Sequence, residues 1–222
     1  MTGVNKVNSE DIKIIFKNNF AKLNEQFVIH QSAFMAGVYK RYFNDLEMGN
    51  IVLCFAKTLH LSILRQREDN LHQDISFDNF WNNHNKCLHH KFKIIDVSNC
   101  SGLPKETTRR KIKELIKLKV LKKRDEKIIW DPLEPDRQSY NIIIKKNINS
   151  LSRLTKFFLD FVGTPKSLIE IEKEIKDNYS FYWYHYLNTQ QSYFRLWQGH
   201  LKDLELLLIS LECSIQGAQI FS

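Results

Sequence analysis

The chain has 222 residues, of which 33 are basic and 25 acidic, so its formal net charge is +8. Hydrophobic residues make up 43% and charged residues 26%, a composition that is typical of folded chains and excludes global disorder. Glycine (7) and proline (4) are too scarce for the many tight turns of a β-sandwich or barrel. The composition therefore predicts a mainly α protein.

The four cysteines, Cys54, Cys87, Cys100 and Cys213, are widely spaced and include no C-x-x-C pair. This spacing is typical of reduced thiols in a cytosolic protein and not of a disulfide scaffold. The longest apolar run, residues 204–211, is interrupted by polar residues and is far too short to cross a bilayer. We therefore expect a cytoplasmic protein with no targeting segment and no membrane contact.

In the first part of the chain, apolar residues recur at helical spacing over residues 9–45. A second apolar stripe predicts a helix over residues 46–68. Residues 70–85 are polar and are expected to form a loop with one helical turn, after which a short helix is expected at residues 86–91.

In the last part of the chain, residues 131–149 contain two steps from an acidic residue to proline, which predict a connector. Helical spacing returns from about residue 150 to residue 222. Breaks in this helical part are expected at residues 163–165, which are Gly-Thr-Pro, and near residues 177–178.

Six apolar positions within residues 39–53 align at a constant offset with six positions within residues 194–208. One explanation is a duplicated helix pair on either side of a central insert. The other is that any two amphipathic helices align this well. The sequence leaves both explanations open.

The positive charge is concentrated in one short window. Residues 1–104 carry a net charge of +2 and residues 128–222 a net charge of −1. Residues 105–127, with 11 basic and 4 acidic side chains, carry +7. A merely basic protein would spread its charge, so this concentration indicates a local surface for a polyanion.

The same window contains a helix-turn-helix pattern. A first short helix would place Val97 and Ser98 on its inner face, and Gly102 supplies the left-handed residue that ends it. Leu103 would fill the angle between the two helices. Pro104 would begin the second helix, where its missing N–H costs nothing.

The second helix, over about residues 104–118, has an apolar inner face and a basic, hydrogen-bonding outer face. The inner face would bury Thr108, Ile112, Leu115 and Ile116. The outer face carries Lys105, Thr107, Arg109, Arg110 and Lys113. Two short strands, residues 120–121 and 128–130, would then form a hairpin with a charged tip, whose basic residues are Lys122, Lys123, Arg124 and Lys127.

This pattern resembles the winged helix-turn-helix DNA-binding domains of bacterial transcription regulators of the IclR and MarR kinds. The resemblance covers about residues 92–130, on Val97-Ser98, Ser101-Gly102-Leu103-Pro104, Glu106-Thr107-Thr108-Arg109-Arg110, Leu115-Ile116 and Val120-Leu121. Three positions depart from the family pattern. Ser98 replaces an alanine, Thr108 a branched apolar residue, and Lys119 the glycine before the wing.

The resemblance implies a sequence-specific DNA-binding protein and transcription regulator that acts on the bacterial nucleoid. Residues 105–113 would enter the major groove of double-stranded DNA, and the tip at residues 122–127 would follow the backbone or minor groove. Two alternatives stay open: a nucleoid-type protein that binds DNA without sequence preference, and a winged helix that contacts a protein. No effector ligand follows from the resemblance.

The C-terminal part contains a dense aromatic cluster, which allows three interpretations. Its members are Tyr179, Phe181, Tyr182, Trp183, Tyr184, Tyr186, Tyr193, Phe194 and Trp197. Tyr and Trp are enriched at interfaces, so the cluster favours a homodimer interface. The core of a helix pair and a ligand pocket are the other two interpretations.

Other reactive residues do not form a recognisable site. His84, Cys87, His89 and His90 have the chemistry of zinc ligands, but their spacing matches no zinc finger and indicates a polar helix start. The chain has no glycine-rich phosphate loop, G-x-S-x-G or H-E-x-x-H motif. We therefore expect no metal, no cofactor and no enzymatic activity.

These observations predict three parts. Residues 1–85 form an N-terminal helical part, residues 86–132 a winged helix-turn-helix with a small two-stranded wing, and residues 133–222 a C-terminal helical part suited to dimerisation.

Overall fold

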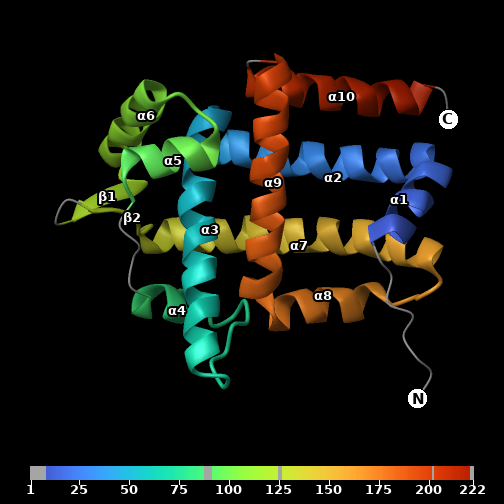
Figure 1. Ribbon diagram of the computed structural model, residues 1–222, viewed down its shortest axis with the longest axis horizontal. Helices are drawn as coiled ribbons and strands as arrows, with labels where there is room; N and C mark the ends of the chain where they lie inside the picture. Colours follow the sequence, from blue (N-terminus) through green and yellow to red (C-terminus); the bar gives the residue numbers. More distant parts are fainter. Residues whose placement is uncertain (1–8, 88–91, 125–126, 202, 221–222) are drawn as a thin grey trace.

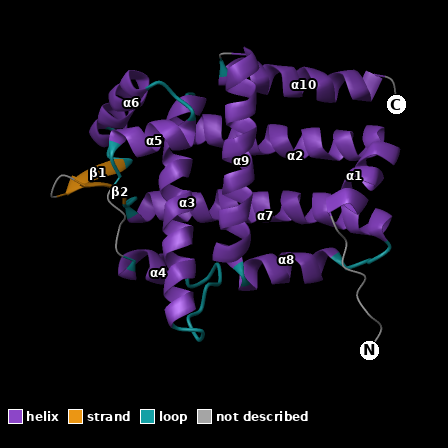
Figure 2. Cartoon of the chain, viewed as in Figure 1, coloured by secondary structure: helices purple, strands orange, loops and turns teal. Residues whose placement is uncertain are grey.

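The computed structural model describes residues 9–87, 92–124, 127–201 and 203–220, apart from the side chains of Lys127 and residues 218–220. The described residues form ten helices and one two-stranded antiparallel sheet (Figure 2). The expected mainly α fold is therefore confirmed. In this part of the chain, no helix is both long enough and apolar enough to cross a bilayer.

The elements follow one another in the order six helices, a hairpin and four helices. Their bounds are α1 Ser9–Asn18, α2 Phe20–Arg41, α3 Leu46–Asp69, α4 Phe80–Lys86, α5 Ile94–Ser101, α6 Lys105–Lys117, β1 Leu121–Arg124, β2 Lys127–Trp130, α7 Glu134–Val162, α8 Leu168–Asp177, α9 Tyr179–Leu201 and α10 Leu204–Ile220.

Helices from the two ends of the chain are packed together. At the centre of the molecule α3 lies along α9, and these two cross α2, α7 and α10 (Figure 1). Along the other direction α2 packs between α10 and α7, and α8 packs on α7. The short helices α5 and α6 and the hairpin form one edge of the molecule and rest on α3.

α3 is the innermost helix because it is apolar around most of its circumference. Its buried apolar side chains are Leu46, Met48, Ile51, Val52, Leu53, Cys54, Phe55, Ala56, Leu59 and Ile63. A helix that is apolar on all sides belongs in the interior and not at a surface. α3 is therefore the support on which α5, α6 and β2 are positioned.

The helix predicted over residues 46–68 is confirmed by α3, and helical structure over residues 9–45 is confirmed by α1 and α2, which form two helices instead of one. The chain leaves helical geometry at Asn19, whose φ is −122°. The Asn19 side-chain amide and the Asn19 backbone N–H both donate to the Ile15 carbonyl over 3.0 Å. The polar segment before residue 86 holds the two-turn helix α4. The short helix expected at 86–91 falls mostly on residues 88–91, which lie outside the described residues.

The connector predicted over residues 131–149 is wrong, because α7 begins at Glu134. Pro135 stands in the first turn, where a missing N–H breaks no helical hydrogen bond, so this proline starts a helix instead of interrupting one. The two predicted breaks in the C-terminal part are confirmed. α7 ends at the left-handed Gly163, whose φ is 73°, and α8 ends at Asp177.

The aromatic cluster belongs largely to the core. Tyr179, Trp183, Tyr186 and Phe194 are all less than 9% exposed within the single chain. These four rings are therefore unavailable to a partner, and the interpretation as a helix-pair core holds for them. Beside the cluster, α7, α8 and α9 enclose a hollow of about 410 Å³, which Tyr182 and Tyr186 help to line.

One buried histidine lies in this core without a hydrogen bond. His60 of α3 is 0% exposed, and its ring lies 4.9 Å from that of Phe80 and 5.1 Å from that of Tyr179. Neither ring nitrogen has a hydrogen-bond partner in the described part of the chain. Burial lowers the pKa of His60 to about 3.

We expect His60→Phe to raise the free energy of unfolding by about 1–2 kcal/mol at pH 7, because it removes an unpaired buried imidazole. The gain grows by about 2 kcal/mol at pH 5, since the unfolded histidine binds a proton below about pH 6.5 whereas the folded one stays neutral. Urea titrations at the two pH values measure both effects.

The matched control is His72→Gln, which removes an exposed imidazole. Its unfolding free energy should differ from that of the parent chain by less than about 0.5 kcal/mol. A His60→Phe chain that is as acid-sensitive as the parent would contradict the prediction.

Candidate nucleic-acid interface

The turn between α5 and α6 has the predicted chemistry. Gly102 is left-handed, with φ 77°, and its N–H donates to the Ser98 carbonyl over 2.9 Å. Leu103 is 4% exposed and fills the angle between the helices, and α6 starts directly after Pro104. A side chain at Gly102 would also meet Arg195 and Gln198 of α9, so glycine is required here for space as well as for φ.

Two of the three departures from the family pattern explain each other. The Ser98 hydroxyl donates to the Leu103 carbonyl over 2.6 Å, and the Thr108 hydroxyl donates to the same oxygen over 3.4 Å. One carbonyl accepts both bonds, so the two buried hydroxyls are satisfied inside the turn. These two hydrogen bonds hold α5, the turn and α6 together.

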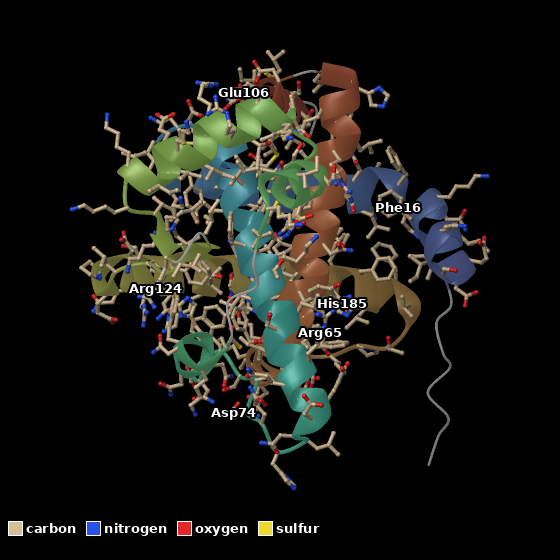
Figure 3. All side chains as sticks on the ribbon, turned by 60° about the vertical axis from the view of Figure 1, so that its left-hand side comes forward. Phe16, Arg65, Asp74, Glu106, Arg124 and His185 are labelled. Atoms are coloured by element: carbon tan, nitrogen blue, oxygen red, sulfur yellow. The ribbon has the colours of Figure 1, made fainter. Side chains whose placement is uncertain are left out.

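α6 has one buried and one exposed face. Thr108, Ile112 and Leu115 are at most 2% exposed and Ile116 is half-buried, which confirms the predicted inner face. On the outer side Lys105, Arg110 and Lys113 are exposed, while Thr107 and Arg109 are half-buried. Figure 3 turns this edge forward, with Glu106 on α6 above Arg124 on the hairpin.

One basic residue of α6 does not belong to the surface. Lys111 is 6% exposed and forms ion pairs with Asp45 and, over 3.0 Å, with Glu47. Although burial alone would lower the pKa of Lys111, the two carboxylates raise it. No pattern in the sequence indicates this pairing, because the partners lie more than sixty residues away. Through these ion pairs Lys111 links α6 to the start of α3.

Removing the ion pairs of Lys111 is expected to destabilise the protein. Lys111→Met should lower the free energy of unfolding by about 1–3 kcal/mol, because it leaves two partly buried carboxylates without their cation. Urea denaturation measures the loss. Lys113→Met removes an exposed lysine from the same helix and should change the value by less than about 0.5 kcal/mol. Equal losses in the two chains would refute the assignment.

The hairpin is attached through its base. β1 pairs with β2 from Leu121 opposite Trp130 to Arg124 opposite Lys127, and Leu121, Ile129 and Trp130 are buried. The His84 ring nitrogen Nε2 lies 2.9 Å from the Trp130 carbonyl oxygen, which joins α4 to the hairpin.

The predicted cations of the hairpin are in different surroundings. Lys122 pairs with Asp131 over 2.8 Å, and Arg137 of α7 binds the same carboxylate over 3.1 Å. Lys123 and Arg124 are exposed. The side chain of Lys127 and residues 125–126 lie outside the described residues. Lys122 therefore helps to hold the base of the hairpin, and Lys123 and Arg124 are the described cations near its end.

The third departure from the family pattern is a left-handed lysine. Lys119 has φ 61°, in the region that favours glycine. Its N–H donates to the Ile116 carbonyl over 3.0 Å, and the N–H of Val120 donates to the Leu115 carbonyl over 2.9 Å. This is the hydrogen-bond pattern of a Schellman motif, in which glycine is the usual residue at this position.

Lys119→Gly is expected to raise the free energy of unfolding by about 0.5–1 kcal/mol, because glycine adopts this conformation without the steric cost of a Cβ. Lys117→Gly, two residues earlier and still helical, should instead lower it by about 1 kcal/mol. Thermal and urea unfolding of the two variants test the opposite signs, and a loss of stability in both would contradict the prediction.

The structure brings only part of the predicted set together. Arg109, Lys113 and Lys123 line one groove of about 410 Å³ between α6 and the hairpin, with Lys93 as a fourth cation. Its floor is apolar and consists of Phe92, Ile94, Ile112, Ile116 and Ile128. Thr107 and Arg110 are not among the lining residues.

Two of these groove residues need comment. Lys93 was not predicted as a site residue. In the sequence, only its position just before the first short helix indicates such a role. Arg109 is bound by Glu106, whose carboxylate oxygens lie 2.5 and 2.9 Å from the guanidinium nitrogens.

The described members of the histidine and cysteine run before α5 have structural roles. His84 is 1% exposed and joined to the hairpin, and Cys87 is buried near Gln66. His89 and His90 lie outside the described residues. Within the described ranges, no three His, Cys, Asp or Glu side chains converge as metal ligands would.

Comparison with known proteins adds no relative. We found no match to the chain among protein-family models, curated proteins or solved structures. Function is therefore inferred from the geometry and charge of α5, α6 and the hairpin alone.

Proposed function

We propose that the chain is a winged helix-turn-helix protein that binds double-stranded DNA, with α6 in the major groove and the hairpin as its wing. One observation carries the proposal: α6 buries its apolar face against α3 and turns Lys105, Arg110 and Lys113 outward beside the exposed Lys123 and Arg124. A helix can enter the major groove only if it projects from its own domain, and α6 lies at the edge of the molecule (Figure 1).

The charge that faces solvent at this edge is smaller than the sequence total. Lys111 is neutralised inside the protein, Lys122 is held by Asp131, and Arg109 by Glu106. The remaining exposed cations still match a phosphate backbone. Contacts to about four to six phosphates give a plot of log affinity against log salt with a slope of about −4 to −5.

Arg110 is the stronger candidate for reading a base. Arg109 must release Glu106 before its guanidinium can meet a guanine, whereas Arg110 is exposed and has no ion-pair partner among the described residues. A free guanidinium can bond the O6 and N7 atoms of guanine bidentately. Thr107 lies close to Arg110 around the helix axis and can contact an adjacent base edge or a thymine methyl.

The first experiment is recovery of sheared genomic DNA at physiological salt, followed by sequencing. A regulator gives discrete peaks with a shared motif, and the double variant Arg109→Ala/Arg110→Ala loses them. Flat recovery that the double variant also loses would favour a nucleoid-type protein. Recovery no higher than from beads without protein would refute DNA binding and leave a winged helix that contacts protein.

With a recovered duplex in hand, Arg110→Ala should weaken binding by about tenfold or more, the loss of one bidentate base contact. Lys123→Ala should weaken all duplexes alike and reduce the salt slope by about 1. Lys146→Ala removes the same charge from the exposed side of α7 and should change affinity less than twofold. Fluorescence anisotropy at several salt concentrations measures all three, and equal effects of Arg110→Ala and Lys146→Ala would overturn the docking.

The proposed regulator acts as a homodimer in the cytoplasm. Two copies would place their α6 helices about one helical turn of DNA apart, so the shared motif should be palindromic. Apolar side chains that a second copy can cover include some on α1, at the start of α2 and on α10. Ile14 and Phe20 are more than half exposed, as is Ile209. Light scattering at micromolar concentration determines the oligomeric state.

A further inference from the structure

Two of the four cysteines lie together where α5 packs on α3. Cys54 is 0% exposed in the middle of α3, and Cys100 is partly exposed in the last turn of α5. The Asn50 amide, one turn before Cys54, donates to the carbonyl of Ser101, the residue after Cys100, over 2.8 Å, so the packing of α3 on α5 brings the two cysteines together. Cys87 lies near Gln66 and Cys213 is exposed on α10, so neither belongs to this pair.

Two cations flank the pair. Lys57 stands one turn after Cys54 on α3, and Arg195 reaches it from α9. A hydrogen bond from the Cys54 thiol, together with Lys57 and Arg195, lowers the pKa of Cys100 to about 6, whereas burial raises the pKa of Cys54. These effects favour the thiolate form at Cys100 and the thiol form at Cys54.

Gln191 of α9 completes the surroundings of Cys100. Its Oε1 lies 3.3 Å from the Cys100 sulfur, where it accepts from the thiol. Its Nε2 is buried and has no hydrogen-bond partner in the described part of the chain. A half-turn of the Gln191 amide would present this N–H to a thiolate. The site can therefore satisfy Cys100 in either protonation state.

We propose that Cys100 is an oxidation site for hydroperoxides and that Cys54 resolves the product to an intramolecular disulfide between α3 and α5. The geometry suits both roles. The partly exposed sulfur of Cys100 can meet the oxidant, and the buried sulfur of Cys54 beside it is shielded from competing reactants in the solvent. The inference does not depend on DNA binding.

The oxidation of Cys100 to the disulfide proceeds in two steps. The Cys100 thiolate attacks one peroxide oxygen, the O–O bond breaks, and the second oxygen leaves as hydroxide or alkoxide, so the peroxide is reduced and Cys100 becomes a sulfenic acid. The Cys54 sulfur then attacks the Cys100 sulfur. The S–S bond forms, the S–O bond breaks, and the hydroxyl leaves with the Cys54 proton as water.

The test uses the reduced full-length chain and an equimolar amount of hydrogen peroxide. Mass spectrometry of the intact chain should show a loss of two hydrogen atoms, and peptide mapping should find Cys54 joined to Cys100. Dithiothreitol should reverse the change. A bridge between other cysteines, or oxidation of Cys213 while Cys54 and Cys100 stay reduced, would overturn the proposal.

Three variants separate the roles. Cys54→Ser should stop at a sulfenic acid on Cys100 that dimedone traps, and Cys100→Ser should form no intramolecular bridge. Lys57→Gln keeps all four cysteines and should shift the pH midpoint for alkylation of Cys100 upward from about 6. The distant Lys146→Gln should leave the midpoint unchanged, and the same midpoint in both lysine variants would refute the role of the cations. Circular dichroism checks that each variant is folded.

Discussion

The buried ion pairs of Lys111 with Asp45 and Glu47 set the position of α6 and, through it, of the whole DNA-facing edge. Asp45 has a second role, since its side chain accepts the Met48 N–H over 2.8 Å and caps α3. The carboxylate that begins the central helix thus also fixes the basic helix. Buried pairs of this kind contribute more to a defined arrangement than to stability, because desolvation offsets much of their attraction. This use of Lys111 explains why a lysine occupies the inner face of α6.

Local features were predictable from the sequence because their causes are local. The left-handed Gly102, the buried Leu103 and the alternation of faces on α6 follow from residue type and spacing. α7 was missed because its early prolines suggest a break, whereas the structure has Pro135 in the first turn. No role was predicted for Lys111 or Lys93, because their surroundings come from segments distant in the sequence. The pairing of Cys54 with Cys100 was invisible for the same reason.

The packing of the helical parts gives the weak internal similarity a structural setting. α2 lies along α10 and α3 along α9, while α2 contacts α3 and α9 contacts α10. A two-fold repeat that exchanges α2 with α9 and α3 with α10 would map these contacts onto each other. The arrangement is compatible with a duplicated pair of helices. In chain order the basic edge lies between the two pairs.

The packing of α3 against α9 affects how the protein folds during its synthesis. α3 is complete after 69 residues, but the helix that covers it begins at residue 179. During synthesis at about 5–20 residues per second, the apolar circumference of α3 waits for several seconds without its native cover. Contacts so distant along the chain also slow folding, because a long loop must close before they form. A nascent chain of this design therefore exposes apolar surface that can aggregate until α9 has left the ribosome.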